Sequence, residues 1–227
     1  METSGFDKLL TRKVPHIHEK ILLSMDYETF MNCQGVCKTW DDLLVAESFR
    51  KKAYSLYREE MDRALVIKSG HGNAEVVKHL LLRGANPNCI GRALHWMTFR
   101  GTPLTWAGMT GSLDVAKTLL DHGADPNRAT QDGFTPLLLS LVCNEAPLEV
   151  VILLLEKGAD PKRASGNGTS PLHVAARQGN GDVVKALLDQ GGYTNGANRA
   201  GETPISIATN MGNDEMIQLI QNAAPEN

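Results

Sequence analysis

A short phrase built around threonine or serine and proline recurs four times in the second half of the chain, and its spacing restricts the fold more than any other feature. It reads GTPL at 101–104, GFTPL at 133–137, GTSPL at 168–172 and GETPI at 201–205. Its prolines stand at 103, 136, 171 and 204, so the intervals are 33, 35 and 33 residues. A period of roughly 20–50 residues indicates a solenoid in which each repeat is stabilised by its neighbours.

A second, glycine-containing phrase follows each of the first three prolines by about 20 residues. It reads LLDHGADPN at 119–127, LLEKGADP at 154–161 and LLDQG at 187–191, and an earlier copy reads LLLRGANPN at 80–88. Proline is favoured at the first position of a helix, where its missing N–H is unpaired in any case. Glycine in the left-handed conformation commonly ends a helix. Each period therefore predicts two short helices: the first ends at Gly111, Gly179 or Gly212, and the second ends at Gly123, Gly158 or Gly191.

The two phrases together resemble the ankyrin repeat. The resemblance implies an ankyrin domain over 62–227, with repeats near 62–88, 89–127, 128–162, 163–197 and 198–227. Three departures stand out: only His173 keeps the histidine usual after Pro-Leu, the third copy has two extra residues around 144–147, and the second begins with an enlarged finger at 89–100.

In ankyrin arrays the fingers and the first helices form the face that binds partners. Carried over by motif position, the resemblance implies these substrate-binding residues: Trp96, Phe99, Arg100, Met109, Gln131, Asp132, Phe134, Asn167, Arg177, Gln178, Arg199 and Glu202. Two alternatives stay open: Trp96 either contacts a partner or packs the enlarged finger, and the arginines either bind an acidic or phosphorylated peptide or are scattered surface charges. Trp106 faces the scaffold in this register and is expected in the core.

Residues 10–48 have a different pattern. A helical stripe of Ile17, Ile21, Leu22 and Met25 follows Pro15, and two further short helices carry Phe30 and Trp40. Helices this short cannot form a large core alone, so we expect them to pack on another surface. From Val36 to Ser69 there is neither glycine nor proline, which predicts a helical connector over 49–61.

The order of residues 14–40 resembles an F-box, although Val14 and Met25 replace leucine and one residue is missing after Pro15. The resemblance implies binding to the Skp-type adaptor of an SCF ubiquitin ligase and, through it, to a cullin. The implied adaptor contacts are Pro15, Ile17, Ile21, Leu22, Met25, Val36, Cys37 and Trp40.

Composition and motifs argue against several other classes. The net charge of −3 gives no general attraction to nucleic acid, and the apolar runs are too short to cross a membrane. Four cysteines without a secretory signal favour a reduced cytoplasmic or nuclear protein. Cys33 and Cys37 lack the second pair that a structural zinc site needs. Neither a nucleophile elbow nor a phosphate-binding loop is present, so we expect no catalytic residue, metal or cofactor.

The sequence therefore predicts an all-α protein in which an F-box-like module of three helices is joined by a helical connector to about five ankyrin repeats. The function predicted from both resemblances is that of a substrate-recognition subunit of an SCF-type ubiquitin ligase, monomeric apart from that complex. Two alternatives are a non-catalytic ankyrin scaffold or inhibitor with a helical N-terminal cap, and an effector that uses the ubiquitin ligase of a host.

Overall fold

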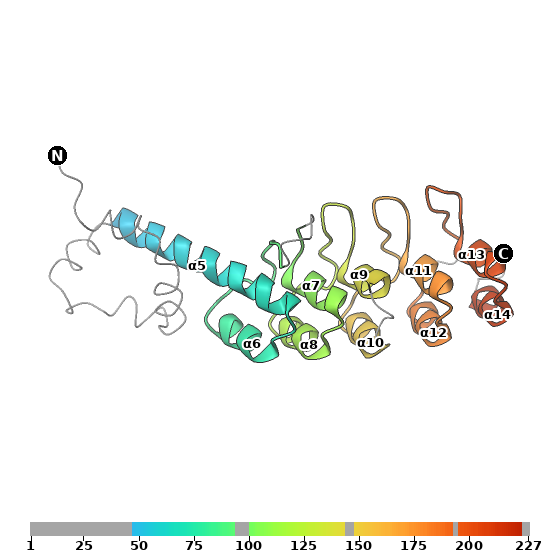
Figure 1. Cartoon of the computed structure of the whole chain (residues 1–227), viewed down its shortest axis with the longest axis horizontal. Coiled ribbons are helices and arrows are strands. Elements are labelled where there is room, and N and C mark those ends of the chain that lie inside the picture. The colour runs from blue at the N-terminus through green and yellow to red at the C-terminus, as the bar shows by residue number, and fades with distance from the viewer. Residues whose placement is uncertain (1–46, 94–99, 144–147, 193–194, 224–227) are drawn as a thin grey trace. The chain divides into compact units, whose positions relative to one another are not determined.

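A computed structural model of the chain describes residues 47–93, 100–143, 148–192 and 195–223 (Figure 1). The chain divides into two compact units, 1–59 and 60–227, and the account below concerns the second. The proposed F-box residues from Pro15 to Trp40 lie outside the described residues.

The described residues are α-helical, apart from loops and a single antiparallel bridge between Gly91 and Gly101. The helices are α5 (Glu47–Gly70), α6 (Ala74–Leu82), α7 (Pro103–Thr110), α8 (Leu113–Asp121), α9 (Pro136–Cys143), α10 (Leu148–Glu156), α11 (Pro171–Gln178), α12 (Gly181–Asp189), α13 (Pro204–Asn210) and α14 (Asp214–Ala223). The prediction of an all-α fold is confirmed for this part of the chain. None of these helices is long and apolar enough to cross a membrane.

Helix α5 differs from the prediction at the start of the first repeat. The predicted connector, 49–61, and the first helix of the first repeat form one uninterrupted helix over Glu47–Gly70. The reason is local: this copy has Arg63 and Ala64 where the others begin a new helix with Thr-Pro or Ser-Pro, and no glycine stands between Val36 and Gly70 to end the helix.

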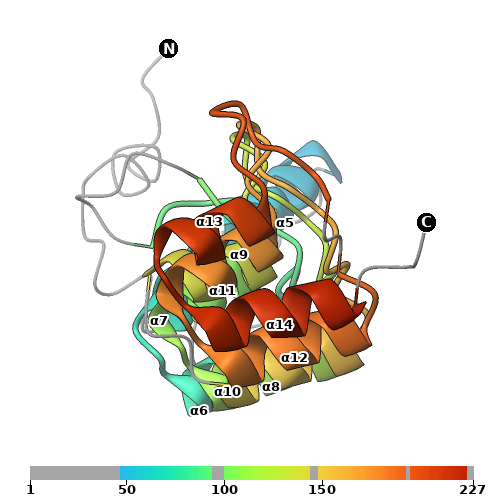
Figure 2. The ribbon, with the colours of Figure 1, turned by 90° about the vertical axis from the view of Figure 1, so that its right-hand side faces the viewer.

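The helices of unit 60–227 form two rows (Figures 1 and 2). The inner row contains α7, α9, α11 and α13, and the outer row contains α6, α8, α10, α12 and α14; neighbours in each row pack side by side. Leucines buried between the rows form the core, among them Leu104, Leu119, Leu137, Leu154 and Leu187. Each leucine fully removed from water contributes about 1.5–3 kcal/mol, so stacking supplies the stability that a single helix pair lacks.

Side-chain caps fix the first residue of the inner helices. Thr102, Ser170 and Thr203 each accept the backbone N–H three residues later, and a proline follows each of them. At the other end, α7 and α11 stop at Gly111 and Gly179, as predicted from the sequence, and these glycines have φ of 67° and 71°, in the left-handed region. Because the start of each helix is fixed, the C-terminal end of the loop that precedes it is held in place.

Helix α9 ends without such a glycine, since the third repeat carries its extra residues there and 144–147 lie outside the described residues. The side chain of Gln178, at the end of α11, donates a hydrogen bond from Nε2 to the carbonyl of Leu141 in α9. The next repeat thereby supplies a partner for a carbonyl near the end of α9.

An asparagine ladder joins the bases of the first three repeats. Asn88 donates to the carbonyl of Gly123 (3.0 Å) and accepts from the N–H of Asp125 (2.7 Å). Asn127 repeats this pattern on Gly158 (2.8 Å) and Asp160 (2.7 Å). Lys162 occupies the corresponding position in the next repeat, so the ladder does not continue to Gly191.

Candidate partner-binding surface

The loops before the inner helices project in a row along unit 60–227 (Figure 1). We name them finger 2 (89–101), finger 3 (128–135), finger 4 (163–169) and finger 5 (196–203); residues 94–99 of finger 2 lie outside the described residues. Two backbone hydrogen bonds close each of fingers 3, 4 and 5. The first runs from the N–H of Thr130, Ser165 or Asn198 to the carbonyl four residues later, at 2.9–3.0 Å. In the second, the N–H of a glycine three residues later donates back to the carbonyl of that first residue, at 2.8–3.0 Å. The three loops therefore share one hairpin geometry.

Adjacent fingers are also bonded to one another. The N–H of Gly166 donates to the carbonyl of Asp132 (2.8 Å), and the N–H of Arg199 donates to the carbonyl of Asn167 (2.9 Å). At Gly133 a Cβ atom would lie 2.8 Å from the nitrogen of Gly166, so only glycine permits this close approach. Fingers 3 to 5 consequently form one continuous polar edge.

Finger 2 is larger, and its base is held by three contacts. Gly91 and Gly101 exchange two backbone hydrogen bonds of 3.0 Å, and the indole N–H of Trp106 donates to the carbonyl of Gly91 (3.1 Å). The guanidinium of Arg100 donates to the carbonyl of Ile90 (3.1 Å). The buried Trp106 confirms the prediction of a core residue and also positions the base of this finger.

Two shallow hollows lie along the fingers. The first, of about 310 Å³, lies between fingers 2 and 3 and is lined by Ile90, Arg100, Thr130 and Gln131 among others. The second, of about 410 Å³, is lined by Gln131, Asp132, Phe134, Asn167 and Arg199 among others. Gln131 borders both, so the hollows are neighbours on one surface.

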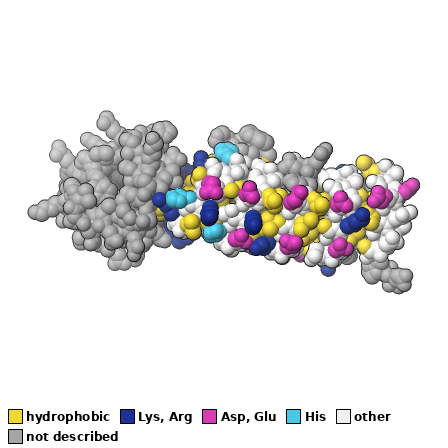
Figure 3. All heavy atoms as spheres, turned by 90° about the horizontal axis from the view of Figure 1, so that it is seen from below, with side chains coloured by type: hydrophobic (Ala, Val, Ile, Leu, Met, Phe, Trp, Pro, Cys, Tyr) yellow, Lys and Arg dark blue, Asp and Glu magenta, His cyan; other side chains and the backbone are white. Residues whose placement is uncertain are grey.

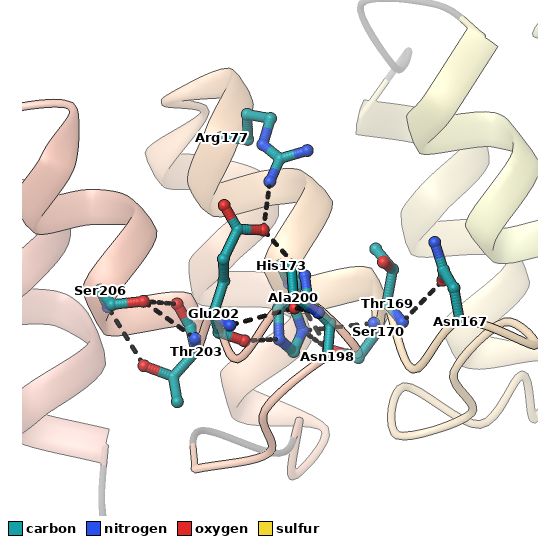
Figure 4. A network of polar contacts seen from close by, with 10 residues as sticks. All are labelled: Asn167, Thr169, Ser170, His173, Arg177, Asn198, Ala200, Glu202, Thr203 and Ser206. Atoms are coloured by element: carbon teal, nitrogen blue, oxygen red, sulfur yellow. Dashed lines mark hydrogen bonds and ion pairs between the residues drawn. The ribbon is translucent and has the colours of Figure 1, made fainter.

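A polar network supports the end of this surface near fingers 4 and 5 (Figure 4). Glu202 accepts hydrogen bonds from Asn198 (2.9 Å) and from the guanidinium of Arg177 (2.8 Å). The Asn198 amide, and secondly Arg177, hold the pKa of the Glu202 carboxyl below its usual value. The Glu202 carboxylate is therefore ionised and already forms an ion pair with Arg177 of the preceding repeat.

His173 connects this network to the core. The N–H of Ser170 donates to His173 Nδ1 (3.2 Å), so the proton of the neutral ring is on Nε2, which donates to the carbonyl of Glu202 (3.0 Å). The side chain is nearly inaccessible, and its burial lowers the pKa of His173. A neutral histidine thus caps α11 and holds finger 5 against it.

The structure places the predicted substrate-binding residues in four groups. Gln131, Asp132, Phe134, Asn167, Arg100 and Arg199 line the two hollows. Arg177 and Glu202 pair with each other, and Gln178 bonds to α9. Trp96 and Phe99 lie outside the described residues.

Met109 is the exception, because only 6% of it is exposed and it packs with Val66, Ala93, Trp106 and Leu139. It is a core residue rather than the surface contact predicted from its motif position. Ile90 and Thr130 also line the first hollow, and we did not predict them. Their position in the sequence, beside the bases of the fingers, could have indicated them.

The described cysteines are poor nucleophiles. Burial and, secondarily, Asp62 raise the pKa of the Cys89 thiol to about 12, and burial raises the pKa of Cys143. Neither thiol is ionised to a useful extent at neutral pH. Within the described ranges, no group of three or more histidine, cysteine, aspartate or glutamate side chains could hold a metal ion.

The stacked helix pairs and projecting fingers define a solenoid repeat protein whose candidate site is a binding surface. The family model for ankyrin repeats (3 copies) matches residues 65–165 and 144–226, most of the chain. The chain therefore belongs to the ankyrin-repeat family, and the predicted resemblance is confirmed.

Individual relatives match over shorter stretches. The chain is 34% identical over 101 residues to cyclin-dependent kinase 4 inhibitor B of Rattus norvegicus, covering 39% of this chain and 72% of the relative. It is 40% identical over 68 residues to the Mus musculus protein of that name, covering 30% and 47%. It is also 35% identical over 81 residues to the 2-5A-dependent ribonuclease of Mus musculus, covering 36% of this chain but 10% of the ribonuclease.

Proposed function

We propose that the chain is a non-catalytic protein-binding scaffold whose fingers hold a partner protein. The observation that carries the proposal is the continuous edge of fingers 3 to 5, with two hollows that meet at Gln131. Fixed loops on a rigid scaffold bind without a large ordering cost, because their backbone is already held in place.

The relatives support a role that needs only binding. Cyclin-dependent kinase 4 inhibitor B is named for inhibiting a kinase, and this chain spans 72% of the rat protein and 47% of the mouse protein. A repeat array that occupies a partner's surface can inhibit it without catalysis. The ribonuclease match covers one tenth of that protein and gives no reason to propose nuclease activity.

A matched pair of substitutions tests this function. Gln131→Trp places a bulky uncharged side chain between the two hollows, whereas Gln218→Trp makes the same change at an exposed position of the outer helix α14. In affinity purification with quantitative mass spectrometry, partners bound by the wild-type chain should fall about ten-fold with Gln131→Trp, because the larger side chain occupies the hollows and a buried interface contact is worth roughly 1–2 kcal/mol. They should be retained by Gln218→Trp.

The reverse result, with partners lost from Gln218→Trp and kept by Gln131→Trp, would place binding on the outer helices and contradict the proposal. Circular dichroism of both variants checks that the exposed substitutions leave the fold unchanged.

A second candidate function rests on the order of residues 14–40, which resembles an F-box. In this proposal the N-terminal module binds a Skp-type adaptor, and the repeats hold the substrate of the resulting ubiquitin ligase. The chain would contribute proximity and orientation, while another subunit performs the transfer. The support is the sequence pattern alone, since these residues lie outside the described part of the structure.

A further inference from the structure

The charges of the repeats are separated by type and by position. The four finger segments contain five arginines (Arg92, Arg100, Arg128, Arg163 and Arg199), no lysine, and two acidic residues. The five outer helices contain nine aspartates and glutamates, three lysines and no arginine. Figure 3 shows acidic side chains distributed along the outer-helix face, with basic and apolar side chains between them. The fingers are thus the basic side of a domain whose other side is acidic.

Arginine in place of lysine is informative at these positions. A guanidinium presents a planar set of donors that matches a carboxylate in a bidentate geometry, which an ammonium cannot do. Arg100, Arg128, Arg163 and Arg199 are all exposed, and none forms an ion pair with a described residue. Their charge is therefore available to a partner.

The two acidic residues of the fingers are not equivalent. Glu202 already pairs with Arg177 at 2.8 Å and with Asn198, so its charge is compensated. Asp132 is exposed and shares the second hollow with Arg199, but the two side chains form no ion pair. An incoming carboxylate would meet Arg199 favourably and Asp132 unfavourably.

The distance between the two hollows sets the length of a segment that could contact both. Arg100 lies at the first hollow, in finger 2, and Arg199 lies at the second, in finger 5. Packed helices are about 8–10 Å apart, so three repeat intervals span roughly 24–30 Å. An extended chain covers that distance in about seven to nine residues, at roughly 3.3 Å per residue.

We propose that fingers 2 to 5 bind an extended acidic segment of a partner protein, with carboxylates on Arg100 and Arg199 and an apolar side chain beside Ile90 or Phe134. This inference rests on the proposed function, because it names the class of partner for the same surface. Opposite charge on the segment and the fingers also accelerates association.

The first step of the test is a selection. The full-length chain is used to select from a displayed library of random peptides of about 12 residues, at about 50 mM salt, where screening is weak. We expect the selected peptides to be enriched in aspartate and glutamate. A selected peptide is then labelled, and its binding is measured by fluorescence anisotropy beside a copy with glutamine for glutamate and asparagine for aspartate.

The finger variants are expected to change the affinity for the acidic peptide in opposite directions. Arg100→Gln and Arg199→Gln should each weaken binding of the acidic peptide about three- to ten-fold, as expected for partly exposed ion pairs. Asp132→Asn should strengthen it, because it removes the opposing charge. Lys185→Gln removes an exposed cation from the outer helix α12 and should leave binding unchanged.

Different results would contradict the acidic class of partner and the proposed function. Selected peptides that are neutral or basic, yet lose binding with Gln131→Trp, would overturn the acidic class while leaving the proposed function intact. Peptides that bind equally to all finger variants would overturn both. If no peptide is enriched, the inference is wrong, and the partner purification described above still tests the proposed function.

Discussion

At the scale of the residue, His173 shows how one side chain supports both a helix and a finger. It caps α11 by accepting the Ser170 N–H at an unprotonated Nδ1, and it holds the carbonyl of Glu202 with the proton on Nε2, so the neutral ring makes both bonds at once. Protonation of Nδ1 would place a donor against the Ser170 N–H. The sequence marks this residue as the one histidine that follows a Pro-Leu of the repeats, but its tautomer and partners come from the fold.

The pKa of His173 predicts a dependence of stability on pH. Burial lowers the pKa of His173 in the folded state below its unfolded value of about 6.5, so the unfolded chain binds the proton more readily. This contribution of His173 to the free energy of unfolding is complete above the unfolded value and is lost progressively as the pH falls from there through the lower pKa of the folded state. We expect the free energy of unfolding in urea to decrease from about pH 7.5 to pH 5.

His173→Gln should remove most of this pH dependence and cost about 1–2 kcal/mol at neutral pH, through the lost hydrogen bonds. His122→Gln, a matched change at an exposed outer-helix end, should keep the dependence. An unchanged pH profile in the His173 variant would contradict the assigned role.

At the scale of the element, the distance between neighbouring inner helices depends on small residues. A Cβ atom on Gly108 of α7 would lie 2.7 Å from the carbonyl oxygen of Pro136 in α9. Gly108 is buried, so this close approach belongs to the core of the stack. Composition and periodicity do not reveal it, because the glycine lies inside a helix and not at its end.

Gly108→Ala should destabilise the domain by about 1–3 kcal/mol, because the clash with backbone exceeds the roughly 1 kcal/mol that alanine gains in helix propensity. The measurement is the urea midpoint of unfolding followed by circular dichroism. Gly181→Ala in α12 is the control, since the nearest atom to its Cβ would be 3.7 Å away. Equal stability of the two variants would show that α7 and α9 adjust freely.

At the scale of the whole molecule, the N-terminal proposal makes a prediction that is independent of the fingers. Pro15→Ala combined with Trp40→Ala should abolish co-purification with a Skp-type adaptor, because both residues are implied contacts of the F-box-like pattern. The circular dichroism of the repeats should be preserved.

Arg199→Gln is the control for that experiment, because it alters the finger surface and should leave adaptor binding intact. The F-box-like proposal would be contradicted if the Pro15 and Trp40 variant retained adaptor binding, or if the wild-type chain bound no adaptor. The scaffold function would then remain as the proposed function.

The sequence by itself determined the repeat, its period and the ends of most helices, because proline, capping hydroxyls and left-handed glycines act through bonds within a few residues. It also indicated most of the finger residues. Only the tertiary structure decided that Met109 is core, that Gln178 bonds to α9, and that Glu202 is already paired with Arg177. Those outcomes depend on which neighbour each side chain meets across a repeat boundary, and that is set by packing rather than by local pattern.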